Sequence, residues 1–237
     1  MRCGRRPGNL AVTTRAVFFD VDFTLIHPGP SLQGHGHREV CARHGIEIDD
    51  TLFDASVAAA SSMLDAGSGV YDPLIFIEYT RRIIEGMGGR GPGVVDAARE
   101  VYDEWAACHH FSLYEEVAEV LRALHRDGYL IGLISNTHRS LETFERHFEL
   151  HGLFAVAISS SDHGYMKPHP SIFEEGLRRM DVAANEAVMV GDNLAHDIAG
   201  ARAVGMRGIL VARSRPTKPT PPDVPVIQSL RELKGLL

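Results

Sequence analysis

Two carboxylates, one residue apart, follow a short apolar run near the start of the chain. Asp20 and Asp22 come directly after residues 16–19, which are apolar and include β-branched and aromatic side chains. This composition predicts a short buried strand. Two carboxylates at the end of such a strand repel each other and need a cation or a shared proton. Bound Mg²⁺ would supply that charge, so we take Asp20 as a candidate nucleophile and Asp22 as a candidate general acid/base.

Polar residues also follow three later apolar runs. They are Ser135 and Asn136 after residues 130–134, Lys167 after residues 154–159, and Asp192 and Asn193 after residues 187–190. Ligand sites in open parallel sheets lie beyond the carboxyl ends of the strands. Each group alone has an ordinary structural explanation as a helix cap, a solvated lysine or a turn, and an aspartate pair after a strand can also be a turn. Their joint order along the chain is more specific.

Three of these residues are suited to holding a phosphoryl group. The Ser135 hydroxyl, with backbone amides at the start of the next helix, can bind a phosphate oxygen, and Asn136 is placed beside it on the substrate side. Lys167 can neutralise both the nucleophile and the transferring group. We expect Ser135 and Asn136 to bind substrate and Lys167 to take part in catalysis.

The group after residue 190 is suited to a metal ion. Asp192 offers a second hard oxygen ligand for Mg²⁺. Asp197 follows about one helical turn later and could orient Lys167 or a metal-bound water. We therefore expect Asp20 and Asp192 to be ligands and Asn193 and Asp197 to support them.

Apolar runs alternate with helical stretches through most of the chain, which predicts an α/β fold with a parallel sheet covered on both faces. The expected strands are residues 16–19, 130–134, 154–159, 187–190, 208–212 and 224–227, and the expected helices between and after them are 113–127, 139–150, 171–180, 195–204 and 229–236. Residues 25–30 contain two prolines and a glycine and are expected to form a flap over the strand end. Residues 32–108 are rich in helix formers and predict a small helical bundle, with helices near 36–44, 50–65, 72–86 and 93–108.

The segments Asp20-Val21-Asp22-Phe23-Thr24, Ser135, Lys167-Pro168 and Gly191-Asp192 through Asp197 resemble the four motifs of the haloacid dehalogenase superfamily. The match covers roughly Arg15 to Leu237. It implies a Rossmann-like core formed by residues 15–30 and 109–237, an α-helical bundle cap at 31–108, and a phosphoaspartate mechanism. Residues 1–14 are expected to be a flexible leader.

The resemblance also implies roles for individual residues. Thr24 and Ser135 would contact phosphate, and Lys167 would stabilise charge. The Mg²⁺ ligands would be Asp20, Asp192 and the backbone oxygen of Asp22. One position departs from the pattern, because Phe23 stands where many members have glycine, which affects the expected geometry of the flap.

Asp22 favours one branch of this superfamily. Members that displace halide from carbon lack an acid at this position, whereas an alkoxide leaving from phosphorus benefits from a proton donor. The sequence therefore predicts a Mg²⁺-dependent phosphatase that acts on a small phosphorylated metabolite.

Other functions remain as alternatives. A sugar phosphomutase would use the same four groups, and a haloacid dehalogenase is disfavoured by Asp22. A phospho-signalling or nucleotide-binding module also combines acids, a hydroxyl and a lysine on a parallel sheet, but receiver domains lack the helical insert, and no glycine-rich phosphate loop follows the first strand.

Composition restricts the partners. The formal net charge of −7 argues against nucleic acid and membrane surfaces, which need a basic face. The three cysteines, Cys3, Cys41 and Cys108, form no disulfide or metal pattern, which indicates reduced thiols in the cytoplasm. We expect a small-molecule phosphate ester as the partner and a monomer or homodimer.

The cap holds further candidates. The pair Arg81-Arg82 on a predicted helix is interpreted as a solvated face or as a contact for an anionic substrate. The histidines His35, His37 and His44 have no acid or cysteine that completes a metal set, and Trp105 is expected in the core. We expect the cap to act as a mobile lid that excludes water and selects the leaving group, with substitutions at Arg81, Arg82 or around residues 67–72 changing substrate preference.

Overall fold

The predicted parallel sheet is present and has six strands. The computed structural model describes residues 13–66, 69–213 and 220–237, and within them the strand order is β5-β4-β1-β6-β7-β8. The strands are β1 (Ala16–Phe19), β4 (Leu130–Ser135), β5 (Val156–Ser159), β6 (Ala187–Gly191), β7 (Arg207–Val211) and β8 (Val226–Ile227). Central β1 pairs in parallel with β4 and β6, so Phe19 lies opposite both Leu133 and Val190. The carboxyl ends of these three strands therefore meet at one edge.

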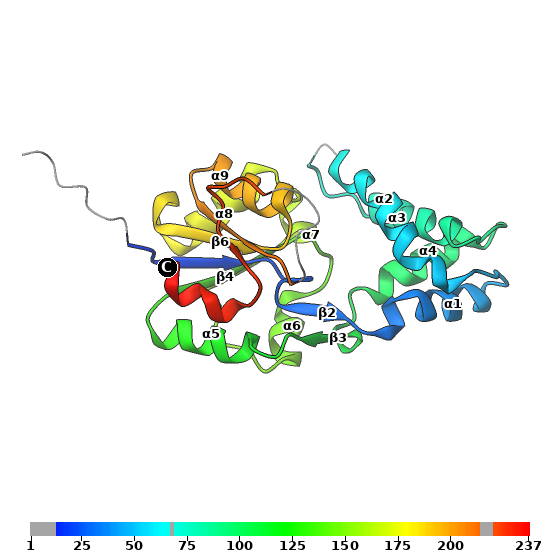
Figure 1. Cartoon of the computed structure of the whole chain (residues 1–237), viewed down its shortest axis with the longest axis horizontal. Helices are drawn as coiled ribbons and strands as arrows, with labels where there is room; N and C mark the ends of the chain where they lie inside the picture. The colour runs from blue at the N-terminus through cyan, green and yellow to red at the C-terminus, as the bar shows by residue number, and fades with distance from the viewer. Residues whose placement is uncertain (1–12, 67–68, 214–219) are drawn as a thin grey trace, which may run out of the picture.

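Alternate residues of β1 serve two separate cores, one on each face of the sheet. Val17 and Phe19 belong to the core that includes side chains of α5 (Val117–Arg126), α6 (Leu141–His147) and η7 (Leu230–Gly235). Ala16 and Phe18 belong to the opposite core, with side chains of α8 (Pro170–Met180) and α9 (Gly200–Ala203). Helices thus cover both faces, as expected of consecutive crossovers between parallel strands (Figure 1). A short helix α7 (Ser160–His163) follows β5.

A helical bundle lies beside the sheet, beyond strands β2 and β3 in Figure 1. Its helices are α1 (Gly34–Arg43), α2 (Phe53–Ala60), α3 (Pro73–Gly86) and α4 (Val94–Glu104). Helices α1, α3 and α4 share an apolar core that includes Val40, Ile77, Ile84 and Val101, while Ala60 of α2 packs in a second cluster with Ile83 and Met87. The expected helix at 50–65 is divided into η2 (Asp50–Leu52), α2 and η3 (Ser61–Ala66), because Asp49 caps η2 and starts a turn of 3-10 helix before α2. The remaining 3-10 helices are η1 (Pro30–Leu32), η4 (Cys108–His110) and η5 (Ala184–Glu186).

A two-stranded ribbon connects the bundle to the sheet. Strand β2 (Ile26–Pro28) pairs antiparallel with β3 (Phe111–Leu113), and Pro28 lies opposite Phe111. The backbone N–H of Gly29 donates to the His110 carbonyl at 2.7 Å and extends the pairing toward the bundle. Residues 25–30, expected to form an irregular flap, thus contain a strand. That strand was not predicted because it has only three residues and ends in proline.

The described residues bear on the expected thiols and on membrane spans. No helix among residues 13–66, 69–213 and 220–237 is long and apolar enough to cross a membrane. Cys41 and Cys108 are buried free thiols. Cys3, most of the expected leader, and residues 67–68 of the proposed specificity segment lie outside the described residues.

Candidate active site

Lys167 joins two of the predicted site carboxylates. Its ammonium donates to Asp20 Oδ1 and to Asp197 Oδ1, each at 2.6 Å. All three side chains are buried, and they come from the end of β1, the loop before α8 and the segment after β6. Burial alone would lower the pKa of Lys167, but the charges of Asp197 and Asp20 outweigh it and raise that pKa. Lys167 is therefore a permanent cation beside Asp20.

The carboxylates outnumber this cation. Carboxylate oxygens of Asp20, Asp192 and Asp197 lie within 4.8 Å of one another. Burial raises the pKa of Asp20 to about 7; Lys167 opposes that rise, and repulsion from Asp197 adds to it. Asp192 keeps an exposed surface, yet loss of surrounding water, followed by repulsion from Asp20 and Asp197, raises its pKa well above its usual range. A second cation would relieve this repulsion, and a set of hard oxygen donors fits Mg²⁺.

The backbone of the segment after β6 fixes the position of the Asp197 side chain. Asn193 caps the π-helix η6 (Leu194–Ala199), since its side-chain oxygen accepts from the N–H groups of Ala195 and His196. Asp197 Oδ2 accepts from the Asn193 N–H at 2.9 Å, while Oδ1 binds Lys167. The expected helix 195–204 is thus split into η6 and α9. Asn193 shapes the turn, and Asp197 projects from η6 to Lys167.

Two buried hydroxyls near the strand ends have no hydrogen-bond partner within the described part of the chain. They are Thr24 Oγ1 and Ser135 Oγ, and both residues are almost completely buried. An unpaired buried hydroxyl costs free energy that a bound acceptor would recover. Ser135 ends β4, next to β1, so its position agrees with the expected phosphate contact.

Asn136 has a different set of contacts from the one expected. Its side-chain amide donates to the Lys167 carbonyl at 2.9 Å, and its Oδ1 accepts from the Lys167 N–H at 2.7 Å. Both polar groups of this side chain therefore hold the backbone that carries Lys167. The residue also lines the adjoining cavity.

Asp22 is paired with a residue that sequence reasoning missed. The guanidinium of Arg139 donates to Asp22 Oδ1 at 2.9 Å and to the Trp105 carbonyl at 2.8 Å. It also lies over the Phe111 ring, 4.2 Å from the centroid. The Arg139 side chain is fully buried, whereas Asp22 retains 16% exposure. Asp22 is thus held by a cation that also contacts the segment returning from the cap, at the Trp105 carbonyl and the Phe111 ring.

Phe23, which stands where many family members have glycine, adopts a left-handed backbone conformation. Its φ is 63°, in the left-handed region, where side chains other than glycine cost roughly 1–2 kcal/mol. A turn holds it there, with the Phe23 N–H bonded to the Ile26 carbonyl at 2.7 Å. Its ring is 6.3 Å from that of Trp105, and both residues line a cavity.

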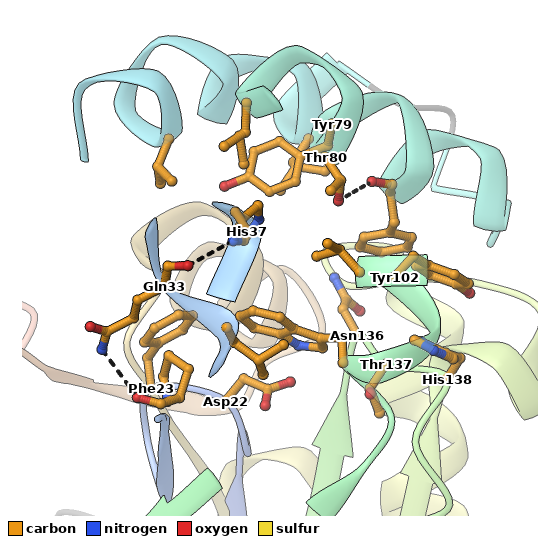
Figure 2. Close-up of a pocket in the computed structure, with 18 of the residues that line it drawn as sticks. Asp22, Phe23, Gln33, His37, Tyr79, Thr80, Tyr102, Asn136, Thr137 and His138 are labelled. Atoms are coloured by element: carbon orange, nitrogen blue, oxygen red, sulfur yellow. Dashed lines mark hydrogen bonds between the residues drawn. The ribbon is translucent and has the colours of Figure 1, made fainter. Parts of the chain in front are cut away.

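That cavity lies between the carboxyl edge of the sheet and the cap and has a volume of about 550 Å³. Asp22, Asn136 and Lys167 line it from the core. Figure 2 shows Asp22 and Phe23 at its base and Tyr79 and Thr80 on the cap helix opposite. Asp22, Lys167 and the cap therefore enclose one space, and Lys167 also binds Asp20.

Arg81 and Arg82, interpreted as a solvated face or as a contact for an anionic substrate, bind acids of their own helix. Arg81 binds Glu78 and Glu85, and Arg82 binds Glu78, all on the same helix, and neither arginine lines the cavity. The solvated-face interpretation of this pair agrees with the structure. The expectation that Trp105 is only a core residue was incomplete, since it also lines the cavity.

The predicted histidine group does not converge. The Nε2 atom of His35 contacts a carboxylate oxygen of Glu39, and that of His44 contacts a carboxylate oxygen of Glu100. His37 is buried and lines the cavity. These three residues therefore form no common metal site.

Comparison with known proteins agrees with this geometry. A family model described as haloacid dehalogenase-like hydrolase matches residues 14–205. The chain is 28% identical over 235 residues to haloacid dehalogenase-like hydrolase domain-containing protein 3 of Bos taurus, covering 94% of this chain and 92% of that protein. It is 32% identical over 203 residues to ribulose-1,5-bisphosphate 5-phosphatase of Halopiger xanaduensis, covering 82% and 83%.

A solved structure supports the fold. The HAD hydrolase YfnB from Bacillus subtilis superposes with a TM-score of 0.74 at 18% identity, covering 94% of this chain and 98% of that chain. At that identity the likeness concerns the fold, and the family follows from the match to residues 14–205. The chain belongs to the haloacid dehalogenase-like hydrolase family.

Proposed function

We propose that this protein is a Mg²⁺-dependent phosphatase that hydrolyses a small phosphate monoester through a phosphoaspartate on Asp20. The observation that carries this proposal is the placement of Asp20 against Lys167, within 4.8 Å of the carboxylates of Asp192 and Asp197. The phosphatase among the relatives described above supports the same reaction class. Thr24 and Ser135 add two buried hydroxyls that lack partners within the described residues.

The reaction divides into two transfers. The Asp20 carboxylate attacks phosphorus, the bond from phosphorus to the ester oxygen breaks, and Asp22 gives its proton to the departing alkoxide. Water then attacks phosphorus, Asp22 takes up the proton, and phosphate leaves with the Asp20 carboxylate restored. Lys167 neutralises charge near the transferring group in both steps.

The chain offers a set of ligands for the metal. Asp20, Asp192 and the Asp22 backbone oxygen would hold Mg²⁺, which when bound supplies charge neutralisation for the phosphoryl oxygens. Asp197 would orient Lys167. Asn136 would position the backbone of Lys167.

Replacement of the nucleophile tests the proposal. Asp20→Asn keeps the size of the side chain and removes the attacking charge, so phosphate release from 4-nitrophenyl phosphate should fall by at least about a thousandfold. Asp181→Asn is the matched control, because Asp181 is exposed and asparagine tolerates its left-handed φ of 53°. Unchanged turnover in Asp20→Asn would refute the assigned nucleophile.

Metal removal tests the second half of the proposal. EDTA should abolish turnover by the wild-type protein, and added Mg²⁺ should restore it. Asp192→Asn should require more Mg²⁺ for half-maximal rate, because one of its charged oxygen ligands is gone. Full activity in EDTA would contradict the metal role.

A further inference from the structure

The cavity that Asp22 and Lys167 line from the core is otherwise lined largely by rings and aliphatic side chains. Apart from Phe23 and Trp105, the described residues that line it include Leu32, Phe53, Val57, Phe76, Ile83 and Tyr102. The Tyr102 ring stacks on His138 with centroids 4.0 Å apart and planes inclined by 15°, and Phe76 stacks on Tyr102 at 6.2 Å. One wall of the cavity therefore presents flat rings. Its volume of about 550 Å³ is in the range of small-ligand sites.

Among the described lining residues, Lys167 is the sole lysine or arginine. Its ammonium already binds Asp20 and Asp197. The lining also holds two acids, Asp22 and Asp54, which offer no positive charge to a substrate anion. A second phosphate or a carboxylate on the substrate would meet repulsion and no cationic partner there.

The histidines of the lining do not replace the missing cation. Burial lowers the pKa of His37, and burial together with the charge of Arg139 lowers the pKa of His138. Both are thus neutral at pH 7. The third, His196, belongs to η6 in the core rather than to the cap.

The polar groups on the cap side offer acceptors. His37 Nδ1 contacts the Gln33 carbonyl at 3.0 Å, and since a carbonyl can only accept, Nδ1 carries the proton and Nε2 is the acceptor. Thr80 Oγ1 donates to the Phe76 carbonyl at 3.0 Å, which leaves its lone pairs free to accept. Figure 2 shows His37 and Thr80 on the same side of the cavity, across from Asp22.

We infer that the substrate is a phosphate monoester of an uncharged, ring-bearing alcohol, with the ring held against Phe23, Tyr102 and Trp105 in this cavity. The inference rests on the proposed phosphatase function and specifies its leaving group. A hydroxyl or N–H on the ring would donate to His37 Nε2. Esters whose leaving group carries a carboxylate or a second phosphate are poor substrates.

Matched esters test the inference. Benzyl phosphate and 4-carboxybenzyl phosphate differ by one carboxylate on the ring, and phosphoglycolate has the carboxylate without the ring. We expect kcat/KM for benzyl phosphate to exceed that for either acidic ester by at least tenfold. Equal or higher kcat/KM for 4-carboxybenzyl phosphate or phosphoglycolate would overturn the inference.

Binding distinguishes failure of the inference from failure of the proposed function. Trp105 is the only tryptophan of the chain and lines the cavity, so its fluorescence reports occupancy. Benzylphosphonate should change this fluorescence at concentrations at least tenfold lower than 4-carboxybenzylphosphonate in the presence of Mg²⁺. If no ester, 4-nitrophenyl phosphate included, is hydrolysed, the phosphatase proposal fails, and the order of phosphonate binding still decides the nature of the cavity.

Charge variants provide a second, independent readout. Val57→Lys places an ammonium in the lining, and Asp54→Lys does so at an exposed position that tolerates substitution. Both should reduce the preference for benzyl over 4-carboxybenzyl phosphate by at least tenfold. Leu74→Lys is the control, because Leu74 is 59% exposed on α3 and lies outside the cavity, and Val57→Met controls for size. A ratio that stays at its wild-type value in Asp54→Lys and Val57→Lys would refute the inference.

Discussion

Arg139 connects the proposed acid/base to the segments where the cap joins the core. Its guanidinium binds Asp22 and the Trp105 carbonyl and lies over Phe111. The side chain is buried, with its Nε lacking a hydrogen-bond partner in the described part of the chain. An arginine four residues after Ser135 is indistinguishable in sequence from an exposed loop arginine. Arg139 is buried only because the chain brings the end of β4 close to the end of α4 and to β3.

Removal of Arg139 should affect both stability and rate. Arg139→Met leaves Asp22 partly buried without its cation and should lower the free energy of unfolding by up to about 3 kcal/mol. Displacement of Asp22 should lower kcat by about a hundredfold. Urea unfolding and steady-state kinetics measure the two effects.

The double variant separates the two effects. Arg139→Met with Asp22→Asn removes both charges and should recover part of the lost stability without recovering kcat. Wild-type stability and rate in Arg139→Met alone would show that the pair has no such role.

At the scale of elements, the sheet was predictable and its irregular parts were not. Apolar runs at 16–19, 130–134 and 187–190 are long enough to read as buried strands, and β1, β4 and β6 occupy them nearly residue for residue. Strands β2 and β3 have three residues each, which is too short for a periodic signal. The π-helix η6 has the composition of an ordinary helix, and its Asp197 binds Lys167.

The candidate site shows the same division. Asp20, Lys167 and Asp197 were identifiable from their order after successive apolar runs of the chain, and the structure brings them into contact. The engagement of the Asn136 amide by Lys167 was not identifiable, because it depends on the path of a loop thirty-one residues later. The aromatic lining was also hidden, since Phe53, Tyr102 and Trp105 are spread over separate cap elements.

Helix α1 gives the cap a pH-dependent stability through His37. Burial lowers the pKa of this histidine, so the unfolded chain binds a proton more readily than the folded one. The free energy of unfolding should therefore be unaffected above the ordinary pKa of about 6.5 and should decrease as the pH falls below it. The decrease is at most about 1.4 kcal/mol per pH unit for one group.

Urea unfolding at pH 7.5 and 5.5 measures this contribution. His37→Asn should lose less stability between these pH values than the wild-type protein does. His35→Asn on the same helix is the control, because His35 is 56% exposed, and its loss should equal that of the wild type. An equal loss in His37→Asn and in the wild-type protein would contradict the assignment.

At the scale of the molecule, the cap meets the core through the β2–β3 ribbon, and the candidate site lies between the two. Gly29 stands at the cap end of β2, where an added Cβ would lie 3.0 Å from the His110 carbonyl oxygen. A side chain there would require a small shift of the His110 backbone, beside the two strands that carry the cap. We therefore expect this glycine to govern how the cap closes over Asp20.

Gly29→Val should change kcat and KM together, by on the order of tenfold in kcat/KM, because cap closure sets the position of the leaving group. The free energy of unfolding should change by no more than about 1 kcal/mol. Gly235→Val is the control, since a Cβ there meets nothing within 4 Å. Steady-state kinetics with benzyl phosphate and urea unfolding measure both quantities, and wild-type kinetics in Gly29→Val would refute a hinge role.

Because Pro28 pairs with Phe111, the length of the cap between them does not change how the strands of the core pair. For the strands of the core, residues 29–110 act as one closed loop. The entropic cost of closing a flexible loop grows only with the logarithm of its length. A cap of twice the size would add about 0.6 kcal/mol to that cost. The core can therefore accept insertions or exchanges of the whole bundle with little loss of chain entropy, provided that the ribbon is kept.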